Sequence, residues 1–416
     1  MQSDPDIADE SLCNQMDKLI IQPLEKAAIS TVIVIDALDE CKDEEPASAI
    51  LSVLGQFVAK VPRVKFFVTG RPEPRIREGF RLPLLVKATD VFVLHEVEPS
   101  QVNNDIQLFF KHNLSKLRGH QPGLDNWPTK DQLDLLCERA AGLFVFAMAS
   151  VRFIGQRNSN PKRQLDRLLK LPGSSVFEGK AKLRVNTTLD LLYMSILQDA
   201  FGDDDPENDH RVRSVLGAVT LGTNPLSPSA IATLLDFESE DVFPLLLSLH
   251  SLLALQEDIN HPVRLFHKSF PDFIVDSTRC SDPRFLVCPA DQHAELAICC
   301  LELMNRRLEQ NICKLPARVA NSEVNDLKER TKQYIDQALQ YACRSWYKHL
   351  VCTTSAHAPN IAPVLNQFLE QKFLFWLEAL SIIGAPREAV DALEVTAKWP
   401  GVRHTRLLTY FNNSFD

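Results

Sequence analysis

The sequence has no long apolar run, no paired-cysteine motif and no glycine in its first 30 residues. A membrane-spanning helix needs roughly 18 or more consecutive apolar residues, and the longest candidate, residues 143–154, is broken by Arg152. The first ten residues are acidic and polar, which excludes a secretory signal peptide. The 10 cysteines include no C-x-x-C pair, a usage typical of a reducing compartment. We therefore expect a cytoplasmic protein without a membrane segment.

Charge and motif content exclude several classes of function. The net charge of −9 argues against a general nucleic-acid-binding surface. The hydrolase and metalloprotease patterns G-x-S-x-G and H-E-x-x-H are absent. His293 and Glu295 match the H-x-E of zinc deaminases, but no P-C-x-x-C follows them. At 416 residues the chain is expected to form two to four compact units.

Residues 31–40, TVIVIDALDE, carry the strongest functional signal. The apolar, β-branched run at 32–35 predicts a strand buried on both faces of a parallel sheet. Asp36, Asp39 and Glu40 follow it, at the sheet edge where open parallel sheets bind ligands. This is a Walker-B pattern, in which Asp36 would hold Mg²⁺ and Asp39 or Glu40 would position a water molecule. The alternative is an acidic residue that only caps a turn or the next helix.

A second strand is expected at 64–69, followed by Gly70-Arg71-Pro72. An arginine at this strand tip is where P-loop ATPases place a sensor of the γ-phosphate, so Arg71 is the candidate. Between the two strands, residues 46–60 carry apolar side chains at helical spacing and predict the crossover helix of a βαβ unit. A third buried strand is predicted at 91–94.

The pairing of VIVIDALDEC with FFVTGRPEPRI resembles the NACHT domain of fungal-type signalling NTPases. These belong to the STAND class, as do the NOD-like receptors. The resemblance continues in order through GLFVFA at 142–147, LYMSIL at 192–197, PLSPSAIATLL at 225–235 and FHKSFPDFI at 266–274. It implies an ADP/ATP-dependent switch that uses Mg²⁺ and acts through protein partners or a homo-oligomer. It also implies that His267 contacts the β-phosphate of ADP.

The phosphate-binding loop of that family, GxxxxGK[ST], is absent from the sequence. Residues 173–181, GSSVFEGKA, contain a Gly-Lys pair, but the spacing is one residue too long and Ala181 replaces the hydroxyl residue. The resemblance therefore begins just before the Walker-B strand, as in a chain truncated at its N-terminus. We predict that ATP and ADP bind to these residues no tighter than high micromolar. The absent loop favours a chain without enzymatic activity but leaves that question open. The alternative function is a non-catalytic protein–protein interaction scaffold.

The predicted fold is α/β followed by mostly α. Residues 1–118 would form an incomplete P-loop NTPase-like parallel sheet, and residues 119–180 a small helical domain. Residues 181–280 would form a winged helix, and residues 281–416 a C-terminal helical domain that includes one long helix at 322–349. The winged-helix segment has seven basic and fifteen acidic residues, net −8, which is the wrong sign for DNA binding.

Two expectations concern the sheet. In the family strand order, strand 91–94 lies one slot from strand 64–69, so we expect a vacant slot and exposed strand edges that promote aggregation. Asp36, Asp39 and Glu40 repel one another at close range when no cation lies between them. On that ground Asp39→Asn is expected to be neutral or stabilising.

Overall fold

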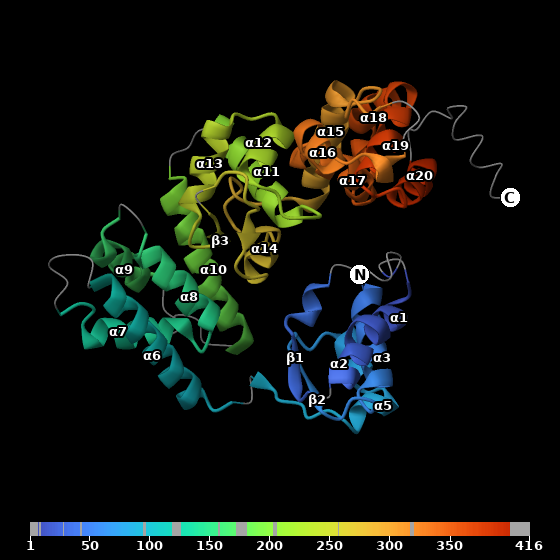
Figure 1. Ribbon diagram of the computed structural model, residues 1–416. Helices are drawn as coiled ribbons and strands as arrows, with labels where there is room; N and C mark the ends of the chain where they lie inside the picture. The colour runs from blue at the N-terminus through green and yellow to red at the C-terminus, as the bar shows by residue number, and fades with distance from the viewer. Residues whose placement is uncertain are drawn as a thin grey trace. The chain divides into compact units, whose positions relative to one another are not determined.

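The computed structural model describes residues 7, 10–27, 29–41, 44–94, 97–118, 126–156, 159–171, 181–202, 206–256, 258–316 and 320–399. The chain divides into two compact units, unit 1 (Met1–Val97) and unit 2 (Glu98–Asp416). Across the described residues the chain is mostly helical and contains two small two-stranded sheets (Figure 1). In this part of the chain no helix combines the length and apolar character that crossing a bilayer requires.

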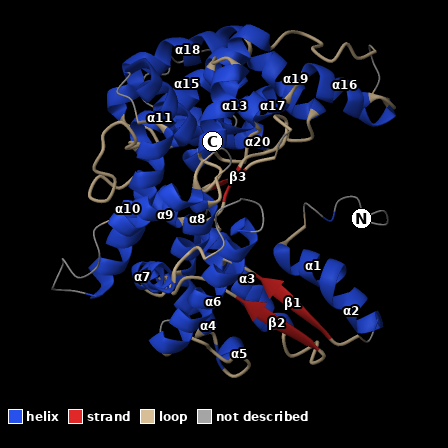
Figure 2. Cartoon of the chain, turned by 90° about the vertical axis from the view of Figure 1, so that its left-hand side faces the viewer, coloured by secondary structure: helices blue, strands red, loops and turns tan. Residues whose placement is uncertain are grey.

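Unit 1 is built on two parallel strands, β1 (Thr31–Ile35) and β2 (Val64–Val68), connected through helix α3 (Glu44–Phe57). The strands pair over their full length, with Thr31 opposite Val64 and Ile35 opposite Val68. Figure 2 shows them side by side with their arrowheads pointing the same way. Parallel strands need a crossover between them, and α3 supplies it. The predicted strand–helix–strand unit is confirmed.

The prediction that both faces of this sheet are buried is wrong. Ile33 and Phe66 pack with α3 and the N-terminal helices. On the opposite face, Val32, Val34 and Phe67 are 59–62% exposed. The N-terminal helices and α3 contribute to the same apolar cluster, so within the described residues only one face of the sheet is covered.

The N-terminal helical segment is divided into three short parts. Helix α1 (Leu12–Met16) is capped by the Ser11 hydroxyl, which accepts a hydrogen bond from the Asn14 amide. A π-helical turn, η2 (Asp17–Ile21), separates it from α2 (Gln22–Ala27). Because proline cannot donate a backbone hydrogen bond, the regular helical pattern changes just before Pro23. Ile21 in this turn is fully buried against α3.

The strand predicted at 91–94 does not form. Helices α4 (Pro74–Phe80) and α5 (Pro83–Val86) follow β2, and the chain then runs through 91–93 without regular structure. Val91, Phe92 and Leu94 are each 75–78% exposed. A strand needs a hydrogen-bonding neighbour, and no described strand runs beside this segment. The predicted arrangement, a third strand beyond a vacant slot, is therefore not present.

Unit 2 begins with four helices, α6 (Pro99–Arg118), α7 (Lys130–Ala140), α8 (Phe144–Ile154) and α9 (Pro161–Lys170). Helix α7 begins with a capping box: the Thr129 hydroxyl accepts from the Gln132 amide, and the Gln132 side chain accepts from the Thr129 amide. Phe110 of α6 and Phe153 of α8 are fully buried in the shared core. Helix α6, predicted to lie in the first domain, thus belongs to the compact body of unit 2.

The middle of unit 2 contains helices and a short hairpin in the predicted order. The elements are α10 (Ala181–Ala200), α11 (Pro206–Leu221), α12 (Pro228–Leu235), α13 (Ser239–Ser248), β3 (Leu253–Ala254), β4 (Arg264–Leu265) and α14 (Ser269–Ile274). The strands β3 and β4 are antiparallel, with Leu253 opposite Leu265. Ser227 caps α12, whose first residue is Pro228.

The rest of unit 2 is helical, as predicted: α15 (Pro289–Arg307), η6 (Asn321–Glu323), α16 (Leu327–Tyr334), α17 (Gln337–Val351), η7 (Ser355–His357), α18 (Ala358–Gln371), α19 (Phe373–Ile382) and α20 (Glu388–Lys398). The prediction of a single helix at 322–349 is wrong, because the helical structure is interrupted between α16 and α17. There Asp336 caps α17 through the Leu339 amide and receives a hydrogen bond from Arg307. These contacts stabilise the start of a new helix.

A buried polar chain connects the loop after α11 with α15 and α17. The Thr223 amide donates to the Tyr341 hydroxyl at 3.2 Å, and that hydroxyl is 2.7 Å from Nε2 of His349. Nδ1 of His349 is 2.8 Å from Nδ1 of His293. His349 is fully buried, and burial lowers the pKa of the half-buried His293 from its ordinary value of 6.5.

This histidine pair makes the stability of unit 2 sensitive to mild acid. Because the pKa of His293 is lower in the folded state, the unfolded state binds more protons as the pH falls below about 6.5. The stabilisation is complete above that pH and decreases below it. We expect urea unfolding of unit 2, followed by tryptophan fluorescence, to show lower stability at pH 5.5 than at pH 7.5. All 4 tryptophans lie in unit 2, so the signal reports on that unit.

The variant His293→Asn keeps a hydrogen-bond acceptor but removes the titrating ring, so its stability should change less over this pH range. His261→Asn is the matched control, because His261 is exposed in the turn between β3 and β4. It should retain the wild-type dependence on pH. Equal dependence in the His293 variant and the wild type would contradict this assignment.

Candidate functional site

The tip of β1 contains the candidate residues of unit 1, and Thr69 determines its conformation. The Thr69 amide donates to the carbonyl of Ile35, and the Thr69 carbonyl accepts from the Leu38 amide, both at 2.9 Å. The Thr69 hydroxyl accepts from the Ala37 amide at 2.8 Å. Ala37 has a φ of 53°, a left-handed conformation that costs a residue with a β-carbon about 1–2 kcal/mol. These bonds hold the strained turn in which the predicted acids lie.

Asp36 lies immediately after β1 and is exposed. One of its carboxylate oxygens accepts a hydrogen bond from the Thr69 hydroxyl, which fixes the side chain at the end of the strand. Sequence reasoning did not select Thr69, although it ends the second apolar run directly before Gly70-Arg71.

Asp39 and Arg71 were predicted to have separate functional roles. In the structure they form an ion pair and a hydrogen bond with each other. Oδ1 of Asp39 accepts from the Arg71 amide at 3.0 Å, and Oδ2 lies 3.6 Å from Nε of Arg71. The Asp39 backbone carbonyl also accepts from the Arg75 guanidinium at 3.3 Å. Asp39 is only 4% exposed, so its charge is removed from water and matched by Arg71. Glu40, the other candidate water-positioning acid, is exposed at the end of the 3₁₀ turn η3 (Leu38–Glu40).

The acidic side chains at the β1 tip do not gather into a metal-binding group. No group of three or more metal-ligating side chains converges anywhere in the described residues. Asp39 is bound to Arg71, which leaves Asp36 as the exposed carboxylate at the strand end. Mg²⁺ is commonly held by one or two carboxylates together with substrate phosphates. Asp36 fits that role as a single oxygen ligand, but these residues do not form a complete magnesium site by themselves.

His267 is the candidate residue of unit 2, and it follows β4. Its Nδ1 accepts from the Ser269 amide at 3.1 Å and lies 2.6 Å from the Ser269 hydroxyl. The same hydroxyl lies 2.7 Å from the hydroxyl of Tyr193 on α10. His267 is exposed, whereas Ser269 and Tyr193 are buried. Tyr193 lies in the motif LYMSIL and Ser269 in the motif FHKSFPDFI, but the sequence alone did not indicate either as a site residue.

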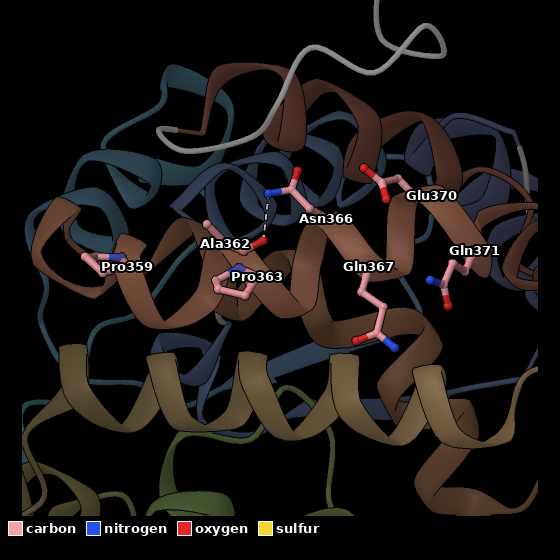
Figure 3. Close-up of a pocket in the computed structure, with 7 residues that line it drawn as sticks. All are labelled: Pro359, Ala362, Pro363, Asn366, Gln367, Glu370 and Gln371. Carbon is pink, nitrogen blue, oxygen red and sulfur yellow. Dashed lines mark hydrogen bonds between the residues drawn. The ribbon is translucent and has the colours of Figure 1, made fainter.

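A pocket of about 470 Å³ lies elsewhere in unit 2, along one side of α18. Figure 3 shows the residues that line it, all from α18, with the Asn366 side chain donating to the carbonyl of Ala362. Glu370 is the ionisable residue among them. None of the predicted site residues lies there, and the lining contains no cationic side chain that would attract phosphate.

Two comparisons with known proteins agree with the motifs. Residues 1–71 match the family described as Nephrocystin 3, N-terminal, a segment that includes Asp36, Asp39, Glu40 and Arg71. Over 390 residues the chain is 25% identical to Vegetative incompatibility protein HET-E-1 of Podospora anserina. That alignment covers 87% of this chain and 26% of the relative, so the chain spans about a quarter of that protein's length. No solved structure matches the chain.

The match to the fungal protein extends over both units, and the family match covers the whole strand–helix–strand unit. The resemblance predicted from the ordered motifs is thereby confirmed. The chain is a relative of the fungal NACHT-type proteins.

Proposed function

We propose that this chain is a regulatory protein of the NACHT signalling type that does not hydrolyse nucleotide by itself. The observation that carries the proposal is the bond between Asp39 and Arg71. An acid that positions water must meet water, and an arginine that senses a γ-phosphate must meet phosphate. Here each of the two side chains has the other as a partner, and the acid is buried.

The charge of the β1 tip supports the same proposal. In P-loop proteins, backbone amides and a lysine supply most of the contacts to phosphate. The sequence contains no GxxxxGK[ST], while Asp36 and Glu40 present exposed carboxylates at this edge. Carboxylates repel phosphate unless Mg²⁺ bridges them. In the proposed function Asp36 would contribute one ligand to such a bridge. His267 is proposed separately, from the family resemblance, as a residue of unit 2 that contacts phosphate.

Regulation of this kind requires partners, and we propose that these are proteins, either other chains or further copies of this one. The middle of unit 2 (α10–α14 with β3 and β4) corresponds to the predicted winged helix. Its net charge of −8 disfavours nucleic acid as a partner. The functional output would then be a change in protein contacts and not a chemical product.

The proposed function predicts that this chain binds nucleotide weakly. We expect calorimetry with Mg-ATP and with Mg-ADP to show dissociation constants no tighter than high micromolar, because the chain lacks the cationic cradle. The control variant Asp36→Asn should weaken binding in Mg²⁺ further, since it removes the proposed metal ligand. A site of sub-micromolar affinity would contradict the proposal.

The Asp39–Arg71 pair also reverses the expectation for Asp39→Asn stated from the sequence. Neutral or increased stability was expected from carboxylate repulsion, but Asp39 accepts a hydrogen bond and pairs with a cation. Asp39→Ala should destabilise unit 1 by about 1 kcal/mol, because the Arg71 amide loses its acceptor and the ion pair is lost. Asp39→Asn, which keeps one acceptor oxygen, should cost less.

Unit 1 contains neither tryptophan nor tyrosine, so its stability must be measured by another probe. Hydrogen–deuterium exchange of peptides covering β1 and β2 reports local opening directly. Glu40→Gln is the matched control, because Glu40 is the exposed neighbour of Asp39, and surface substitutions change stability by about 0.5 kcal/mol or less. Equal exchange in the Asp39→Ala and Glu40→Gln variants would show that the pair contributes nothing to the fold.

A further inference from the structure

The orientation of His267 depends on a chain of hydrogen bonds that runs through the interior of unit 2. Tyr193 on α10 is 1% exposed, and its ring lies against two aromatic side chains of α14. The ring centroids are 5.3 Å apart for Phe270 and 5.5 Å apart for Phe273. A bidentate ion pair between Asp190 and Arg279 also joins α10 to the segment after α14. The Tyr193 hydroxyl is therefore held in a fixed position.

The backbone amide of Ser269 determines the direction of these hydrogen bonds, because an amide N–H can donate but cannot accept. The Ser269 backbone amide can only donate, and it donates to Nδ1 of His267 at 3.1 Å. A proton on Nδ1 would face that amide hydrogen, so Nδ1 must be the unprotonated nitrogen. The Ser269 hydroxyl, 2.6 Å from Nδ1, then donates to the same nitrogen.

With its proton directed at His267, the Ser269 hydroxyl accepts from the Tyr193 hydroxyl, 2.7 Å away. Burial raises the pKa of Tyr193 to about 12, so its hydroxyl remains a proton donor at neutral pH. The order of donation is Tyr193 to Ser269 to His267. In a neutral imidazole the remaining proton must be on Nε2.

We propose that Tyr193 and Ser269 are positioning residues that hold His267 in its Nε2–H form, so that the ring meets an anionic phosphate oxygen as a hydrogen-bond donor. The phosphate as ligand rests on the proposed function, whereas the form of the ring rests on the bonds within unit 2 alone. The two can therefore fail separately.

If the proton were on Nδ1, the unprotonated Nε2 would present its lone pair to the phosphate oxygen and repel it. The Nε2–H form instead gives a favourable bond without a net charge on the ring. The Tyr193–Ser269 chain thus selects the class of group that His267 can bind, an acceptor and not a donor.

The test is nuclear magnetic resonance of the full chain labelled with ¹⁵N-histidine at pH 7.5, with His267 assigned by its loss in His267→Gln. The wild type should show a protonated nitrogen shift for Nε2 and an unprotonated shift for Nδ1. Tyr193→Phe and Ser269→Ala should each change the tautomer ratio by about two- to tenfold, the effect of one lost hydrogen bond. Ser269→Thr, which keeps the hydroxyl, should retain the wild-type ratio.

A wild-type ring with its proton on Nδ1, or with a mixture of the two forms, would overturn the proposal even if every variant failed to fold. An unchanged ratio in folded Tyr193→Phe and Ser269→Ala would also overturn it, because the backbone amide alone would then suffice. Addition of millimolar Mg-ADP to the wild type tests the proposed function separately. If the tautomer is as expected and the His267 signals do not move, the positioning role stands and the phosphate ligand is wrong.

Discussion

Backbone hydrogen bonding between the ends of β1 and β2 determines where each candidate residue of unit 1 lies. Pairing continues past the last strand residues through the Thr69 amide and carbonyl, and the Thr69 hydroxyl adds a third bond to the turn. These contacts fix residues 36–39 against residues 69–71, and the left-handed Ala37 directs the chain into η3. Asp39 is brought to the Arg71 amide as a result. Without this pairing neither the exposed Asp36 nor the buried Asp39 would have its present surroundings.

The same geometry separates two carboxylates that the sequence presents as one cluster. Asp39 is compensated by Arg71 and contributes to the fold, whereas Asp36 remains at the surface with the Thr69 hydroxyl as a donor. A buried, paired carboxylate stabilises the structure that holds it, and an exposed one is available to a cation. Of these two carboxylates, Asp36 is thus the one that remains accessible at this edge.

Much of this structure follows from local sequence patterns. The strand–helix–strand unit and the helical C-terminal segment both follow from the spacing of apolar residues along the chain, and both were predicted correctly. The segment 91–94 was not, because an apolar run does not show whether a neighbouring strand is present to pair with it. The break at Asp336 was also missed, since apolar spacing continues across it and the Arg307 contact is tertiary. The Asp39–Arg71 bond spans 32 residues and the Tyr193–Ser269 bond 76, distances at which single-sequence patterns carry no signal.

The central claim is that the residues of the β1 tip do not perform nucleotide hydrolysis by themselves. Its most direct test is release of inorganic phosphate from Mg-ATP by the purified chain, compared with the Asp36→Asn and Glu40→Gln variants. We expect the wild type and both variants to release phosphate at the same rate as buffer alone. Sustained turnover by the wild type that Asp36→Asn abolishes would contradict the account.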